Sequence, residues 1–122
     1  MKGIVITTED SVAIRELGDH PAPAIHEIVG GHFEIVKPVG LKQPFVMLVN
    51  DEGLLLDLEL NAIGSVLYGT LAHGHPIVGN IVIMKLGYTV DGLDVVGLKD
   101  QEAFDLYQLF INMLVRPNER RN

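Results

Sequence analysis

Residues 77–84 read Ile-Val-Gly-Asn-Ile-Val-Ile-Met and are the part of the chain that decides its architecture. Apolar side chains fall on both faces of this segment, and that pattern predicts a strand in the centre of a sheet. Asn80 and Lys85 interrupt the apolar run, so it is too short to cross a bilayer. The segment therefore predicts the core of a folded domain rather than a membrane span.

Two hairpins are predicted before this strand. Residues 3–16 carry β-forming side chains on either side of a turn at residues 8–10. Residues 45–49 and 54–56 flank Asn50-Asp51-Glu52-Gly53, and a four-residue connection that ends in glycine is typical of a type I turn closed by a left-handed residue. Both patterns favour antiparallel pairing of neighbouring strands.

Three helices complete the prediction. A short helix enters near Pro21 and ends at Val29, because Gly30 suits the left-handed residue that terminates a helix. A second helix spans residues 62–71 behind an Asn61 cap, and a third spans residues 101–115. The expected fold is a single α+β domain with a curved, mainly antiparallel sheet and about three helices.

The composition fits one globular domain of 122 residues, with 48% hydrophobic and 20% charged residues. The chain has no cysteine, so it has no disulfide, thiol nucleophile or thiolate metal site, which suits a cytoplasmic protein. The amino terminus lacks the pattern of a signal peptide. A net charge of −7 argues against binding to duplex nucleic acid. We expect no cofactor and no membrane association.

The third helix is apolar around most of its circumference. Its only polar stripe consists of Asp105, Gln108 and Asn112. An ordinary surface helix buries a stripe little wider than 100°, so this helix needs a partner on a second side. We expect a homo-oligomer through residues 99–116, with Phe110 and Leu114 in the contact, a family-like core in residues 1–98 and a tail in residues 117–122.

Residues that could perform catalysis do not form a recognised constellation. His73 and His75 are the only close histidine pair, and they are candidate metal ligands, but no third ligand is marked by its spacing. Ser65 lies within a predicted helix rather than in a nucleophile elbow. Asp57 and Glu59 alternate with leucines, as expected for an amphipathic strand.

Polar residues in apolar surroundings mark a candidate ligand site. Asn61 begins a helix whose free amides would suit an anion, with Ser65 and Tyr68 one turn further along and Asn80 in the central strand. The same residues also fit structural roles, in which asparagines satisfy backbone groups and Tyr68 fills the core. The cations available for a phosphate group are Lys2, Arg15, Lys37, Lys42 and Lys85. Of these, we assign Lys37 to the site.

Four short motifs give the chain a family resemblance. In order they are Val29-Gly30-Gly31-x-x-Glu34, Asn50-Asp51-Glu52-Gly53, Leu58-x-Leu60-Asn61-x-x-Gly64-Ser65 and Val78-Gly79-Asn80-Ile81-Val82. Their order and spacing resemble the small family catalogued as domain of unknown function 3846, over residues 1–98. The helix after Asp100 lies beyond the resemblance.

The resemblance implies an accessory protein of phages and mobile elements that acts in the cytoplasm of an infected bacterium. We expect a non-catalytic binder that sequesters a small nucleotide-like immune signal, as an anti-defence sponge. The alternatives are a protein-binding inhibitor of a host enzyme, acting through an acidic surface, and a small metal-dependent hydrolase that uses His73 and His75.

Overall fold

The structure is a computed structural model that describes residues 1–119, and the side chains of residues 1–114. In chain order, its elements are β1 (Lys2–Ile6), β2 (Val12–Glu16), α1 (Ala22–Val29), β3 (Phe33–Val36), β4 (Phe45–Asn50), α2 (Ala62–Tyr68), α3 (Thr70–His73), β5 (Ile81–Thr89), β6 (Gly92–Val96) and α4 (Asp100–Glu119). The predicted α+β class is confirmed. Four helices are present among the described residues, and one of them is a single turn.

The six strands form one open sheet in the order β2-β1-β5-β4-β3, and β6 pairs with the distal part of β5. Every strand pair is antiparallel. The predicted central strand is therefore central, although β5 begins at Ile81 rather than at residue 77.

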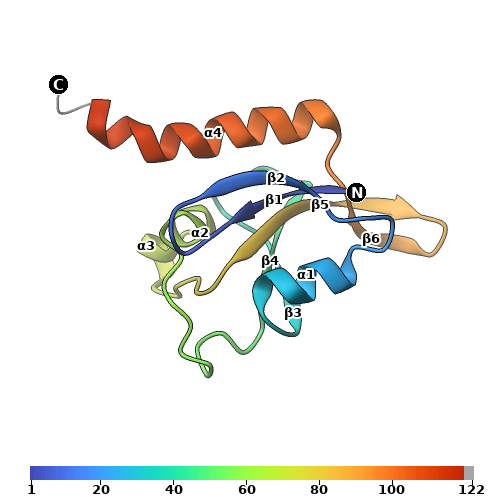
Figure 1. The fold of residues 1–122 in the computed structure, drawn as a ribbon, viewed down its shortest axis with the longest axis horizontal. Helices are drawn as coiled ribbons and strands as arrows, with labels where there is room; N and C mark the ends of the chain where they lie inside the picture. Colours follow the sequence, from blue (N-terminus) through green and yellow to red (C-terminus); the bar gives the residue numbers. More distant parts are fainter. Residues whose placement is uncertain (120–122) are drawn as a thin grey trace.

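Helices cover both faces of the sheet. Figure 1 shows α4 along one side of the sheet and α1 on the opposite side. The face under α1 presents alternating buried residues such as Val5, Leu48 and Val82. The other face presents the neighbouring positions, such as Ile4 and Ile83, to α2 and α4. The near-continuous apolar character of β5 follows from this burial on two sides.

The predicted hairpin across residues 50–53 is wrong. Leu54, Leu55 and Leu56 lie in a turn and form no strand. The reason is that β4 already pairs with β3 along one edge and with β5 along the other, so neither edge is free for residues 54–56. Asp57 lies in the same turn and Glu59 lies just beyond it, so neither belongs to the predicted amphipathic strand.

Two glycines change the predicted boundaries of other helices and strands. Gly69 adopts a left-handed conformation with φ of 91°, so the predicted helix over residues 62–71 is divided into α2 and α3. Gly92, with φ of 106°, supports a tight connection between β5 and β6, a hairpin that was not predicted from the sequence.

Helix α4 is longer than predicted and packs against β1 and β2. Phe110, which we expected in an oligomer contact, is fully buried in the core of its own chain, and Leu114 packs against the same core. Phe104 and Leu109 are instead exposed, at 53% and 45%. The predicted tail begins inside α4, and residues 120–122 lie outside the described part. No described helix is both long and apolar enough to span a membrane.

Candidate functional site

Asn61 is fully buried at the start of α2 and makes three hydrogen bonds within the protein. Its Oδ1 accepts a hydrogen bond of 2.9 Å from the backbone amide of Gly64, which caps the helix. Its Nδ2 donates to the backbone carbonyls of Ile6, at 3.0 Å, and Gly79, at 2.9 Å. Both amide hydrogens are therefore used, and the short helix does not present an open end to an anion.

Ser65 and Asn80 also hold backbone groups. The Ser65 hydroxyl donates to the carbonyl of Ile77 at 3.2 Å and accepts from its amide at 3.0 Å. Asn80 lies just before β5 rather than within it, and its Oδ1 accepts a hydrogen bond of 3.1 Å from the amide of Thr8. Both side chains therefore satisfy backbone groups, which is the structural role that the sequence allowed as an alternative to ligand binding.

The motif at residues 50–53 is anchored in a similar way. The Asn50 side chain is buried, donates to the carbonyl of Val29 at 3.0 Å and accepts from the amide of Glu52 at 2.8 Å. It thereby ties the end of β4 to the end of α1. The side-chain nitrogen of Asn50 would lie 3.3 Å from a Cβ at Gly31, so the double glycine leaves room for this tie. The short motifs thus build the scaffold.

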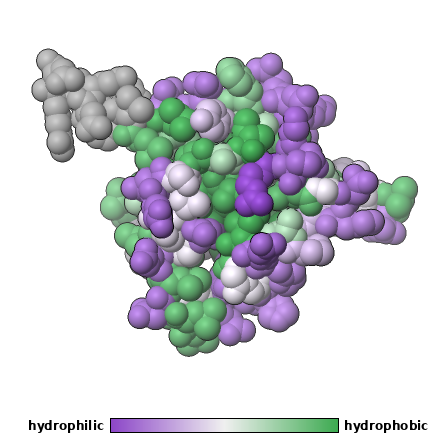
Figure 2. Space-filling model, viewed as in Figure 1, coloured by the Kyte–Doolittle hydropathy of each residue, from purple (hydrophilic) through white to green (hydrophobic). Residues whose placement is uncertain are grey.

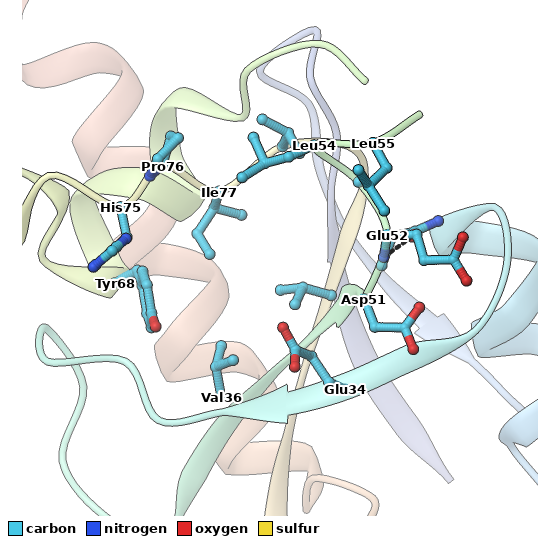
Figure 3. Close-up of a pocket in the computed structure, with 14 residues that line it drawn as sticks. Glu34, Val36, Asp51, Glu52, Leu54, Leu55, Tyr68, His75, Pro76 and Ile77 are labelled. Atoms are coloured by element: carbon cyan, nitrogen blue, oxygen red, sulfur yellow. Dashed lines mark hydrogen bonds between the residues drawn. The ribbon is translucent and has the colours of Figure 1, made fainter. Parts of the chain in front are cut away.

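Tyr68 belongs to a different environment, a cleft of about 550 Å³ at the β3 side of the sheet, which we call the edge cleft. It lies between β3, the end of β4, the loop that follows β4, α2 and the segment before β5. Figure 3 shows Tyr68 and His75 on one wall, Asp51 and Glu52 on the opposite wall, and Glu34 rising from β3 between them. Leu54, Leu55 and Ile77 complete the rim.

The edge cleft carries three carboxylates, those of Glu34, Asp51 and Glu52. All three residues are exposed, and none forms an ion pair with a described residue. Their positions are fixed by the backbone: Glu34 pairs with Val49 across the β3–β4 ladder, and the Asp51 amide donates to the His32 carbonyl at 3.1 Å. The cleft is therefore negative on one side.

The rings of Tyr68 and His75 line the other side of the cleft, and the ring of His73 packs against both of them. The ring centroids of Tyr68 and His73 are 4.8 Å apart, and those of His73 and His75 are 5.2 Å apart. His73 Nε2 lies 3.1 Å from the Tyr68 carbonyl, and His73 Nδ1 accepts from the His75 amide at 3.1 Å. A carbonyl can only accept, so this geometry assigns the proton to Nε2. Both ring nitrogens of this metal candidate are thus occupied internally.

The candidate cations do not converge on the edge cleft. Lys2 pairs with Asp100 at 2.5 Å and Lys85 with Glu102 at 2.7 Å. Lys37 directly follows Val36, a cleft residue, but itself lines a second hollow of about 260 Å³ with Phe45 and Tyr88. Among the described residues, no group of three acidic or histidine side chains is arranged to hold a metal ion.

Of the five predicted ligand residues, only Tyr68 lines the edge cleft, while His75, predicted as a metal candidate, lines it as well. Glu34 and Asp51 were not predicted as site residues from the sequence. Both lie inside quoted motifs, but their convergence with residues 68 and 75 depends on the pairing of β3 with β4 and on the position of α2.

The described residues thus form a small α+β domain with the edge cleft at the β3 side of its sheet. The chain belongs to the family described as a domain of unknown function (DUF3846), whose model matches residues 1–111. The match extends beyond residues 1–98, over which the resemblance was expected, and includes residues 100–111 of α4. Comparisons with curated proteins and with solved structures found no match.

Proposed function

We propose that the chain is a small accessory protein that binds a nucleotide-like immune signal in the edge cleft and holds it without converting it. The cleft is the observation that carries the proposal. Its volume of about 550 Å³ lies within the range of about 300–1,000 Å³ found for small-molecule sites. Ring side chains on one wall and hydrogen-bond acceptors on the other suit a heterocycle that bears amines and hydroxyl groups.

The charges of the cleft favour one orientation of such a ligand. A base would stack beside Tyr68 and His75, since every base has a π-face. Ribose hydroxyls or exocyclic amines would donate to Glu34 and Asp51, because ionised carboxylates only accept. The same carboxylates repel phosphate, so phosphate groups would extend out of the cleft. Lys37, which follows Val36 directly after the end of β3, is the cation next to this strand.

Internal hydrogen bonding supports binding over the alternative of a hydrolase that uses His73 and His75. The hydroxyls of both serines in the chain are engaged, that of Ser11 with Thr7 at 2.7 Å and that of Ser65 with the Ile77 backbone. His73 would lose two hydrogen bonds before it could act as a base or a metal ligand. A protein that only binds and sequesters its ligand needs neither a free serine hydroxyl nor a free histidine ring.

We further propose that the protein acts in an infected bacterium and that it is a homo-oligomer. The motifs shared with the family support a setting in phages and mobile elements, with action in the cytoplasm of the infected bacterium. A homo-oligomer through α4 is supported by the exposed pair Phe104 and Leu109, because exposed aromatic and aliphatic groups on one helix favour association.

The test is a thermal-shift screen of the full chain against adenosine, ADP-ribose and cyclic mono- and dinucleotides. A ligand present at a hundred times its dissociation constant adds about 2.7 kcal/mol to the free energy of unfolding. We expect at least one compound to raise the melting temperature and to be recovered chemically intact. Glu34→Gln should weaken that binding at least tenfold, whereas the matched control Glu9→Gln, in the exposed β1–β2 turn, should not.

Three results would contradict parts of this proposal. A compound recovered as a converted product would indicate the hydrolase. Binding that Glu34→Gln leaves unchanged would place the site elsewhere. A screen in which no nucleotide-like compound changes the melting temperature would reject the ligand class.

A further inference from the structure

The loop that follows β4 exposes three consecutive leucines. Leu54, Leu55 and Leu56 are 69%, 85% and 52% exposed, and we call them the leucine tip. Figure 1 shows this loop extending from the end of β4 to the bottom of the view, and Figure 2 shows apolar surface at the same end of the molecule. Single exposed apolar residues are common on proteins, but a run of three on one projecting loop calls for an explanation.

The leucine tip is held in a defined conformation by backbone hydrogen bonds. The amide of Leu56 donates to the Glu52 carbonyl at 2.9 Å, and the amide of Leu58 donates to the Gly53 carbonyl at 3.1 Å. Asp57 closes the turn in the left-handed region, with φ of 55°. Such a conformation is costly for a residue with a side chain unless the surrounding structure supports it.

The base of the loop is fixed to the segment before β5. A Cβ at Gly79 would lie 2.8 Å from the Leu58 side chain, so Leu58 packs directly against this glycine. The Gly79 amide donates to the Glu59 carbonyl at 2.7 Å, and Leu60 forms an isolated bridge with Val78. The leucine tip is therefore pre-organised, and pre-organisation lowers the entropy lost on association.

Four carboxylates flank the leucine tip in the chain, those of Asp51, Glu52, Asp57 and Glu59. All four residues are exposed, and none forms an ion pair with a described residue. The surface is thus an apolar tip within an acidic border. The acidic border favours binding partners with positive charge around their apolar surface.

We infer that the leucine tip is a docking surface for another protein, one that offers an apolar groove bordered by lysine and arginine side chains. An anionic membrane does not fit, because the acidic border would face negatively charged headgroups. A second copy does not fit either, because a twofold contact through the tip would bring the acidic borders of both copies together. A basic-bordered groove satisfies both the leucines and the carboxylates, and this surface goes beyond the ligand site proposed above.

The experiment places a photo-crosslinking benzoylphenylalanine at residue 55 of the full chain, in the cells from which its gene derives. The matched control carries the same group at Leu71, which is 96% exposed and has no acidic neighbour within four positions in the chain. We expect residue 55, and not residue 71, to label a protein. That protein is then purified and titrated against the wild type, Leu55→Asp and Leu71→Asp by calorimetry.

For the purified pair, we expect Leu55→Asp to weaken binding at least tenfold and Leu71→Asp to change it less than threefold. Raising the salt concentration from 50 to 500 mM should weaken the wild-type complex at least fivefold, because the border contributes charge attraction. Both substituted side chains are exposed, so melting temperatures should match the wild type. The inference is overturned by labelling of lipid, of a second copy or of nothing at residue 55, by equal effects of both substitutions, or by binding that salt does not weaken.

Discussion

Replacement of Asn61 by alanine tests the conclusion that this residue supports the fold rather than a ligand. The substitution removes the cap of α2 and leaves two backbone carbonyls, those of Ile6 and Gly79, without their amide donor. Loss of an asparagine cap costs about 1 kcal/mol. A buried polar group left without a partner costs about 1–3 kcal/mol. Since a carbonyl has a second lone pair for another donor, we take the lower half of that range for each.

The expected loss for Asn61→Ala is therefore about 3–5 kcal/mol of the free energy of unfolding, out of the about 5–15 kcal/mol typical of a domain. The assay is equilibrium unfolding in urea, followed by circular dichroism. With a slope of about 2 kcal/mol per molar, the midpoint should fall by roughly 2 M. Asn61→Ser, which keeps a capping oxygen but loses both donors, should show most of this loss.

Asn112→Ala is the matched control, because Asn112 is exposed on α4 and should change the free energy of unfolding by less than about 0.5 kcal/mol. A loss below about 1 kcal/mol for Asn61→Ala would refute the reasoning, since the three hydrogen bonds would then contribute little. A normal midpoint accompanied by lost ligand binding would restore Asn61 to the ligand site.

Three further predictions concern charge, assembly and backbone conformation. Burial raises the pKa of Glu102, but hydrogen bonds from its lysine partner and from a backbone amide lower it more, so the net pKa is lowered. The ionised Glu102 carboxylate stabilises the fold above its ordinary pKa of 4.5, and this stabilisation is lost as the pH falls through the lower folded value. Glu102→Gln should therefore destabilise the chain by about 1 kcal/mol at pH 7 and not at pH 2 in urea unfolding. Sedimentation at tens of micromolar should find the wild type as a dimer or larger and the Phe104→Glu/Leu109→Glu variant as a monomer; a monomeric wild type contradicts the assembly. Gly79→Ala should lower the free energy of unfolding more than Gly18→Ala does, by at least about 1 kcal/mol, as measured by thermal unfolding. Both glycines have left-handed φ values, 79° and 85°, but only Gly79 lacks space for a Cβ. Equal losses of unfolding free energy would show that packing at Gly79 is unimportant.

Local patterns in the sequence predicted those parts of the fold that local physics determines. The apolar run around Ile81 predicted a central strand, Gly30 predicted the end of α1, and Asn61 predicted the start of α2. In each case, one residue or one short run has the side chain or the conformational freedom that the element requires.

Features that depend on distant pairing were not predictable in this way. Leu54–Leu56 has the composition of a strand, but whether a strand forms depends on a free edge of β4, and both edges pair with strands elsewhere in the chain. Likewise, an asparagine in apolar surroundings looks the same in sequence whether it binds a ligand or a buried carbonyl. The burial and the three internal contacts of Asn61 decide between these roles.

The loop after β4 connects the two proposals, because Leu54 and Leu55 belong both to the rim of the edge cleft and to the leucine tip. A ligand that reaches these side chains and a protein that covers them would use the same atoms. Because coupling between two binding events is reciprocal, the ligand must weaken the protein complex by the factor by which the protein weakens ligand binding. Titration of each complex in the presence of the other component measures both factors, and two unequal factors would mean that one of the components binds elsewhere as well.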